Sequence, residues 1–203
     1  MTRCVEEAEE TIRAFVALDL DSMSTRRLAR IAEHLRLANG APSANWIPPH
    51  KMHVTLRYVE RLPARQVSAL ADALGVAMAG KRPPRPGSAR LEAFPSAAEA
   101  RVVVVGLEDP TRRLARMAGH VERIVSKLGI PPDQHEFRPH VTLARLKRQY
   151  DARRWLRPEL AAHVGECSAV RLTLYRSVLE SGGSTYQPLA RFDFAAREKP
   201  GSP

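Results

Sequence analysis

Hydrophobic and polar residues follow two different periods along the chain, and segments of the two kinds alternate. Phe15–Leu20 and Met52–Val59 have the apolar run or two-residue alternation of strands. Between them, Leu28, Ile31 and Leu35 recur at the spacing of one helix face. The same criteria predict strands over 89–94, 101–107, 141–146, 167–179 and 185–194, and helices over 63–80, 109–128 and 153–163. Pro63 and the Asp109-Pro110 pair are the expected starts of the second and third helices.

This pattern occurs twice. The segment Thr25–Arg30 recurs unchanged as Thr111–Arg116, and the four residues His-Val-Thr-Leu at 53–56 recur at 140–143, 87 positions later. A strand precedes the helix in both copies, at the same distance from the second strand. Two copies of a strand–helix–strand unit predict a molecule with pseudo-twofold symmetry.

The repeated four residues carry the candidate chemistry. Residues two positions apart share one face of a strand, so His53 lies beside Thr55 and His140 lies beside Thr142. Their Val and Leu neighbours face the opposite way, toward a core. If a pseudo-twofold axis relates the two units, two imidazoles and two hydroxyls meet across one cleft.

This set of groups suits the cleavage of a phosphodiester. One histidine can take a proton from the attacking water while the other gives a proton to the leaving oxygen, and threonine hydroxyls can hold the non-bridging oxygens. No metal or other cofactor is needed, and no acidic residue accompanies either motif at metal-ligand spacing. The residues alone leave open which histidine is the acid.

Two arginines near the motifs are candidate phosphate ligands. Arg57 is four residues after His53 and has the parity of the cleft face in a regular strand. Arg145 is five residues after His140 and has the wrong parity, so it reaches the cleft only from a bulge or a strand end. Which of them is the main cation stays open.

Composition narrows the class of protein. The 203 residues suit one domain, and a net charge of +10 favours phosphate-bearing partners, although 27 of the 32 basic residues are Arg, a bias that base composition also produces. If the charge serves RNA, it should be concentrated around the two histidines. No run of apolar residues, Val102–Val105 included, is long enough to cross a bilayer, and two cysteines make no disulfide framework. With an acidic start instead of a signal segment, these features favour a cytoplasmic protein.

The two motifs resemble the paired H-x-T-x motifs of the two-histidine (2H) phosphoesterase superfamily. The chain is most similar to its RNA 2′,3′-cyclic phosphodiesterase branch, also called 2′-5′ RNA ligases. The segments that carry this resemblance are FVALDL at 15–20, WIPP at 46–49, FRPHVTLAR at 137–145 and YQPLARF at 186–192. It covers roughly residues 12–194.

The resemblance implies a bilobal α+β fold with two antiparallel sheets lining a central cleft and helices outside. It also implies hydrolysis of RNA 2′,3′-cyclic phosphate ends to a 2′-phosphate, with His53 as proton donor and His140 as proton acceptor. Thr55, Thr142 and Arg145 would hold the phosphate. The reverse reaction, ATP-independent 2′-5′ joining of RNA ends, is a further implication.

We expect a monomer in which residues 12–194 form a single domain of two intertwined lobes, with flexible ends at 1–11 and 195–203. Two alternatives keep the same site but change its use. One is a non-catalytic basic module that binds RNA ends, and the other is a 2H phosphodiesterase acting on a small cyclic nucleotide. Binding without turnover of a cyclic-phosphate oligonucleotide would distinguish the first of them.

Overall fold

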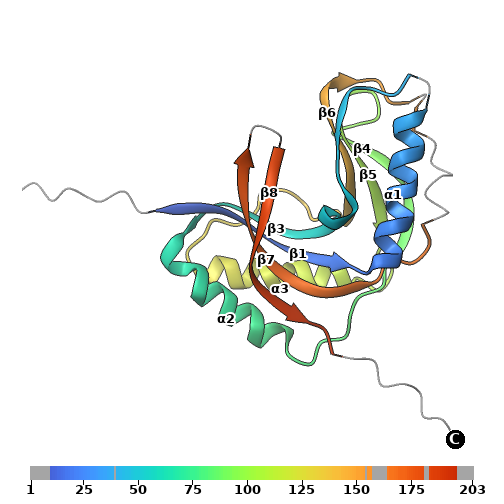
Figure 1. The fold of residues 1–203 in the computed structure, drawn as a ribbon. Helices are drawn as coiled ribbons and strands as arrows, with labels where there is room; N and C mark the ends of the chain where they lie inside the picture. The colour runs from blue at the N-terminus through green and yellow to red at the C-terminus, as the bar shows by residue number, and fades with distance from the viewer. Residues whose placement is uncertain (1–9, 39, 154, 157–163, 181–182, 196–203) are drawn as a thin grey trace, which may run out of the picture.

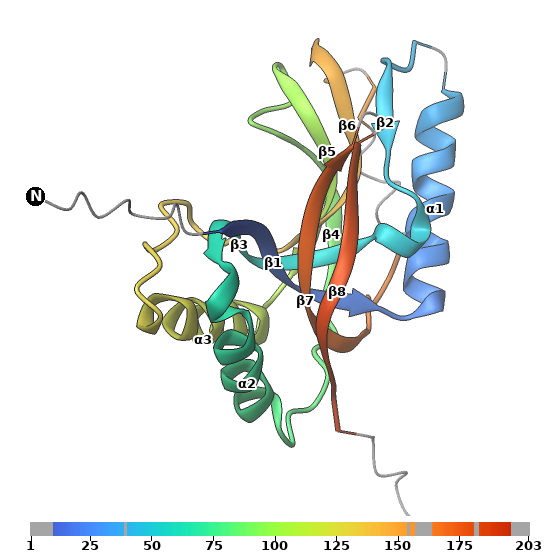
Figure 2. The same cartoon turned by 60° about the vertical axis from the view of Figure 1, so that its left-hand side comes forward.

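The computed structural model describes residues 10–38, 40–153, 155–156, 164–180 and 183–195. Their strands form two four-stranded antiparallel sheets (Figures 1 and 2). The first sheet has the order β3 (His53–Pro63), β1 (Thr11–Leu20), β7 (Ala169–Glu180) and β8 (Gly183–Asp193). The second has the order β2 (Ala44–Trp46), β6 (His140–Tyr150), β5 (Ala100–Glu108) and β4 (Gly87–Phe94). The predicted α+β fold with two antiparallel sheets is confirmed.

In the described part of the chain, three α-helices cover the outer faces of the sheets: α1 (Ser22–Leu37), α2 (Val67–Met78) and α3 (Arg113–Lys127). Two 3₁₀ turns, Pro49–Lys51 and Ala64–Gln66, flank β3. The helix of each sequence repeat packs on the sheet of the other repeat, because α1 contacts β6 and α3 contacts β3. The two halves of the chain are therefore exchanged across the middle of the molecule. None of these helices combines the length and the hydrophobicity that crossing a membrane requires.

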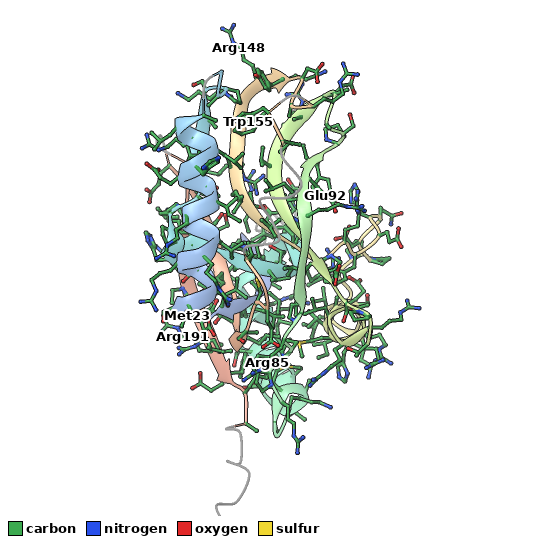
Figure 3. All side chains as sticks on the ribbon, turned by 90° about the vertical axis from the view of Figure 1, so that its right-hand side faces the viewer. Met23, Arg85, Glu92, Arg148, Trp155 and Arg191 are labelled. Carbon is green, nitrogen blue, oxygen red and sulfur yellow. The ribbon has the colours of Figure 1, made fainter. Side chains whose placement is uncertain are left out.

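The first unit shows why its residues form these elements. Most side chains of β1 are buried, as expected for a strand between two neighbours. Asp21 then begins α1, because its carboxylate accepts a hydrogen bond from the Ser24 amide at 2.6 Å. On the inner side of α1, Leu28 and Leu35 are buried, and the buried Trp155 donates from its indole nitrogen to the Leu35 carbonyl (Figure 3).

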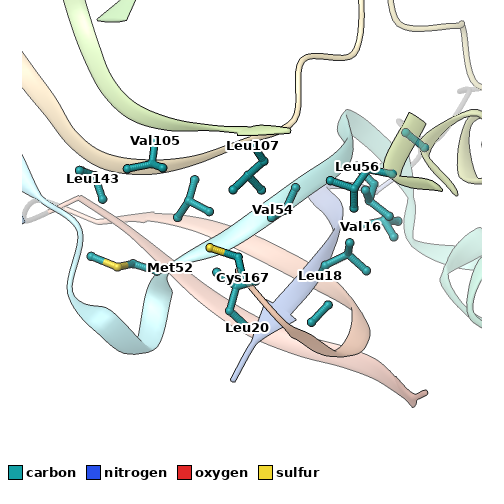
Figure 4. Packing of buried hydrophobic residues seen from close by; sticks show 14 of the residues in the cluster. Val16, Leu18, Leu20, Met52, Val54, Leu56, Val105, Leu107, Leu143 and Cys167 are labelled. Atoms are coloured by element: carbon teal, nitrogen blue, oxygen red, sulfur yellow. The ribbon is translucent and has the colours of Figure 1, made fainter. Parts of the chain in front are cut away.

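The apolar sides of the two sheets share one core. Val54 from β3 lies near Val105 and Leu107 from β5, with Leu143 from β6 beside them (Figure 4). The alternating Val and Leu of the two repeated motifs thus point into this core, and the His and Thr between them point away from it. Burial of these residues fixes the orientation of the site, because shifting either strand by one residue would expose its apolar side chains.

Two helix starts differ from the expectation. Pro63 ends β3, and α2 begins only at Val67, after a 3₁₀ turn. The third helix begins at Arg113, after a turn in which the Arg112 amide donates to the Asp109 carbonyl and Arg112 has φ 53°. Asp109 still caps a backbone N–H group in the first turn of the helix, because its carboxylate accepts a hydrogen bond from the Ala115 amide at 2.9 Å. A capping residue therefore acts here from outside the helix.

The closing antiparallel pair is present as β7 and β8, and β1 begins at Thr11, one residue before the expected domain start. The helix predicted over 153–163 lies outside the described residues except for 153, 155 and 156. The predicted flexible ends also lie outside them, apart from residues 10, 11 and 195.

Candidate active site

The two motif strands lie in different sheets but contact each other, β3 against β6. Each carries a β-bulge directly after its His-x-Thr. In β3 the pairing with β1 jumps from Thr55 to Arg57, and in β6 the pairing with β5 jumps from Thr142 to Ala144. Leu56 and Leu143 are thus the extra residues, and a bulge of this kind reverses the side-chain alternation beyond it.

His53 and His140 are held in the same way at the starts of their strands. The Nδ1 atom of His53 is 2.7 Å from the Lys51 carbonyl oxygen, and the Nδ1 atom of His140 is 2.7 Å from the Arg138 carbonyl oxygen. A carbonyl only accepts, so both Nδ1 atoms donate. In the neutral form of each ring, Nε2 is therefore the basic nitrogen, and it is the atom that exchanges protons.

Aromatic rings surround the first histidine. The Phe15 ring stacks on His53 with centroids 5.0 Å apart, and the Tyr186 ring meets it edge-on at 5.5 Å. Burial lowers the pKa of His53 below its ordinary value of 6.5. The Lys51 carbonyl and the Asp19 carboxylate raise that pKa, whereas the charges of Arg145 and His140 lower it further.

A cavity of about 360 Å³ opens on the His53 side of the two strands. Its lining residues are Phe15, His53, Thr55, Tyr58, Arg145, Ser177, Leu179, Ser184 and Tyr186. They come from β1, β3, β6, β7 and β8, so both sheets contribute to it. Lys51 lies beside this cavity, since its Nζ is 5.7 Å from the Tyr186 ring centre and donates to the Ser184 carbonyl.

The bulge in β6 brings Arg145 to this cavity. Because Leu143 is the extra residue, Arg145 follows Thr142 on the exposed side although the two are three positions apart. Its charge lowers the pKa of both His53 and His140. The positive charge of Arg145 therefore acts on both histidines.

The matching bulge in β3 removes Arg57 from the cleft, which corrects the expectation that it faces a phosphate. The Arg57 side chain is 8% exposed, and its Nε is 2.5 Å from a Glu122 carboxylate oxygen on α3. Its Nη atoms donate to the carbonyls of Tyr58 and Pro131. Leu56 adds one residue to the strand and reverses its parity, so Tyr58 faces the cleft at the position equivalent to Arg145.

Asp19 is the acidic neighbour of His53, with which it pairs directly between β1 and β3. Its carboxylate accepts hydrogen bonds from the hydroxyls of Thr173 and Tyr175, both at 2.8 Å. Burial, followed by these contacts with Asp19, raises the pKa of Tyr175 to about 12, so its hydroxyl stays a donor. Two hydroxyl donors thus orient the Asp19 carboxylate beside the first imidazole.

The second histidine has a different surrounding. Gly106 pairs with His140 between β5 and β6, as Asp19 pairs with His53 between β1 and β3. A carboxylate oxygen of Glu92 is 2.7 Å from the place that the Cβ atom of a side chain at position 106 would take. Burial lowers the pKa of His140, and the cations Arg145 and Arg138 lower it further, whereas the Arg138 carbonyl and Glu92 raise it. Arg138 is itself paired with Glu92 at 3.0 Å.

Residues with metal-binding side chains do not cluster in the described part of the chain, where no group of three or more His, Cys, Asp or Glu is placed to hold an ion.

The predicted site residues His53, Thr55 and Arg145 meet at one cavity. His140 and Thr142 lie on β6, the strand that carries Arg145.

Several residues at the site escaped the sequence reasoning: Phe15, Asp19, Lys51, Tyr58, Ser177 and Ser184. Tyr58 alone had a usable signal, because it stands 87 positions before Arg145, the same offset that relates the two histidines. Phe15 and Asp19 lie on β1, which pairs with β3, whereas Ser177 and Ser184 lie on β7 and β8, farther along the same sheet. Lys51 is in the 3₁₀ turn directly before β3.

A model of the family described as LigT like Phosphoesterase matches the chain twice, over residues 18–104 and 105–186. Each match contains one His-Val-Thr-Leu segment. Two similar curated proteins bear the name RNA 2′,3′-cyclic phosphodiesterase. The one from Aeropyrum pernix is 32% identical and covers 80% of this chain and 92% of its own length, and the one from Aquifex aeolicus is 26% identical and covers 90% and 97%.

Solved structures show the same fold. The crystal structure of TT0787 of Thermus thermophilus is similar with a TM-score of 0.75 and 24% identity, covering 90% of this chain and 98% of that one. The crystal structure of Escherichia coli LigT complexed with 3′-AMP has a TM-score of 0.73 and 21% identity, covering 92% and 100%.

Proposed function

Because the chain belongs to the LigT-like family of 2H phosphoesterases, we propose that it hydrolyses the 2′,3′-cyclic phosphate at RNA ends to a 2′-phosphate by acid–base catalysis with two histidines. The observation that carries the proposal is the matched pair of imidazoles on touching strands, each with Nδ1 bound to a backbone carbonyl. Two rings fixed through Nδ1, each with Nε2 left to exchange protons, suit the two proton transfers of this reaction. The predicted membership of this family is confirmed.

The reaction needs no group beyond those of the chain. His140 takes a proton from water at Nε2 while the water oxygen forms a bond to phosphorus. The bond from phosphorus to the 3′ oxygen breaks, and His53 gives its Nε2 proton to that oxygen, which leaves a 2′-phosphate and a 3′-hydroxyl. Thr55, Thr142 and Arg145 stabilise the negative charge on the non-bridging oxygens as it grows. With a 5′-hydroxyl in place of water, the same step joins two RNA ends without ATP.

The assignment of His53 as the acid follows the family resemblance, because the charges around the two histidines are of the same kind. The carboxylate of Asp19 favours a proton on His53, whereas Arg145 and His140 disfavour it. The carboxylate of Glu92 favours a proton on His140, whereas Arg145 and Arg138 disfavour it. Burial acts against protonation of both rings.

The cavity on the His53 side suits the terminal nucleoside. In this reaction the acid contacts the 3′ oxygen, so the terminal ribose and base lie on the side of the acid. A volume of about 360 Å³ is within the usual range for small-ligand sites. The exposed ring of Tyr58 and the ring of Tyr186 offer flat surfaces for a base, and Ser177 and Ser184 offer polar groups.

The test is incubation with an oligonucleotide that ends in a 2′,3′-cyclic phosphate, in the presence of EDTA. We expect complete conversion to the 2′-phosphate, identified by mass spectrometry and by comparison with 2′- and 3′-phosphate standards. A 3′-phosphate product would contradict the placement of His53 at the 3′ oxygen. Tight binding without any product would favour the non-catalytic module.

The pH dependence of kcat/KM follows from the two lowered pKa values. This parameter reports the free enzyme, so it rises as His140 loses its proton and falls as His53 loses its own. Because both pKa values lie below 6.5, we expect a bell-shaped profile with its maximum below pH 6.5. A bound phosphate anion favours protonated imidazoles, so the profile of kcat should lie at higher pH. An optimum of kcat/KM above pH 7.5, about one unit beyond the ordinary value, would contradict this.

The variant Asp19→Asn separates the acid from the base. Removal of the carboxylate charge lowers the pKa of His53 further, so the alkaline limb of kcat/KM should move to lower pH while the acid limb stays. Tyr175→Phe is the matched control, because it removes one hydrogen bond from Asp19 but keeps its charge. Movement of the acid limb instead would make His53 the base, and no movement would show that Asp19 does not act on the reaction.

A further inference from the structure

A second concave surface lies away from the cleft, between α3 and the end of α2 with the residues after it. It has a volume of about 560 Å³. Lys81 and Arg82 line one wall, and Arg113, Arg116, His120 and Arg123 of α3 line the other. Met78 and Met117 also line it. We call this surface the basic groove.

The basic residues of α3 form a continuous row. Arg113, Arg116, His120, Arg123 and Lys127 follow one another at alternating spacings of three and four residues, which places them on one face of a helix. That row is about 21 Å long at 1.5 Å per residue. A smaller cavity lined by His120, Arg123, Ile124 and Lys127 extends the basic groove toward the end of α3.

Negative charge is kept away from this row. Glu122 lies on α3 as well, but its carboxylate is turned inward to Arg57. Among the described residues, no carboxylate is within ion-pairing distance of Arg113, Arg116, Arg123 or Lys127, although surface arginines elsewhere are paired, such as Arg36 with Glu33 and Arg85 with Glu166. Like charges at these spacings destabilise a helix, so the row lowers the stability of α3. An anionic ligand bound to the row would offset this repulsion.

The basic groove and the cleft lie on opposite faces of the first sheet. Thr55 of β3 faces the cleft, and Arg57, beyond the bulge, points to α3 on the other face. Figures 1 and 2 show α2 and α3 together under this sheet, away from the open side between the two sheets. A ligand in the basic groove therefore does not take part in the chemistry at the histidines.

We propose that the basic groove binds the phosphate backbone of the RNA strand whose end occupies the cleft, at nucleotides upstream of that end. The proposal rests on the proposed function for the identity of the ligand. A row of basic side chains complements the regularly spaced negative charges of a nucleic-acid backbone. A membrane surface is less suitable, because the apolar face of α3 is buried and none of the large exposed apolar side chains of the described residues lies on this helix.

The test measures binding of an RNA of about 20 nucleotides without a cyclic phosphate, by fluorescence anisotropy over a series of salt concentrations. The variant Arg116→Glu/Arg123→Glu should bind about tenfold more weakly and lower the salt slope by about 1.4, two contacts at 0.7 each. The matched control is Arg26→Glu/Arg30→Glu on the exposed side of α1, which makes the same change of charge and should bind like the unaltered protein.

Turnover of a cyclic-phosphate mononucleotide should be unchanged in both variants, which shows that the fold and the site are intact. Equal weakening by the two variants would overturn the proposal in favour of non-specific attraction. Loss of binding to vesicles of anionic lipid, with RNA binding retained, would assign the groove to a membrane. A protein that binds this RNA but hydrolyses nothing would contradict the proposed function and leave the basic groove as an RNA site.

Discussion

Replacing His140 by alanine is expected to lower kcat/KM toward an RNA 2′,3′-cyclic phosphate by about 10² to 10⁴, and His53→Ala should cause a loss of the same order. The imidazole of His140 removes a proton from water, and that of His53 donates one to the 3′ oxygen. Each Nε2 is fixed by the hydrogen bond of its own Nδ1 to a backbone carbonyl. Water does not replace a base or an acid held in this way.

The pH profiles of the two variants distinguish a catalytic loss from a structural one. The profile of His140→Ala should keep only its alkaline limb, and that of His53→Ala only its acid limb, because each lacks one titrating group. His135→Ala is the control, since this imidazole is 92% exposed and pairs with Asp133. Full activity in both active-site variants would rule out two-histidine catalysis.

The second large effect contrasts Arg145→Met with Arg57→Met, two arginines that follow equivalent motifs. Arg145→Met should lower kcat/KM by about 10² to 10³, the loss typical of one removed charge-stabilising group, with little change in stability. Arg57→Met should lower the free energy of unfolding by about 3 kcal/mol. This figure is at the low end for a broken buried pair, because the Glu122 side chain that loses its partner is 28% exposed.

Chemical denaturation and steady-state kinetics on both variants test this contrast. The folded fraction of Arg57→Met should keep nearly normal kcat/KM, because its guanidinium lies in the core against α3 and not in the cleft. The reverse result, an inactive but stable Arg57→Met beside an active Arg145→Met, would mean that the bulges in β3 and β6 do not have the described positions.

The placement of the positive charge also differs from the simplest expectation. A charge that serves RNA is expected around the two histidines, yet the cavity itself has one arginine, Arg145, with Lys51 beside it. The larger gathering of cations lines the basic groove on the opposite face. Composition gives the total charge, but its distribution depends on which side of α3 is buried, and the apolar positions Leu114, Val121 and Val125 decide that.

Features that depend on short-range periodicity could be predicted from the sequence. The alternation in His-Val-Thr-Leu predicts which side chains face a core and which face away from it, and the spacing of Leu28, Ile31 and Leu35 predicts α1. The repeat of both patterns, together with the motifs around them, was sufficient to identify the family.

The residues that join the two histidines depend on strand pairing in the folded chain. The bulges at Leu56 and Leu143 arise where β3 pairs with β1 and β6 pairs with β5. The first turns Arg57 into the core, and the second brings Arg145 to the cavity. A bulge depends on the partner strand and on what each side chain can bury, so local parity cannot reveal it. Asp19 likewise meets His53 only across the β1–β3 pairing, and Glu92 approaches His140 only over Gly106.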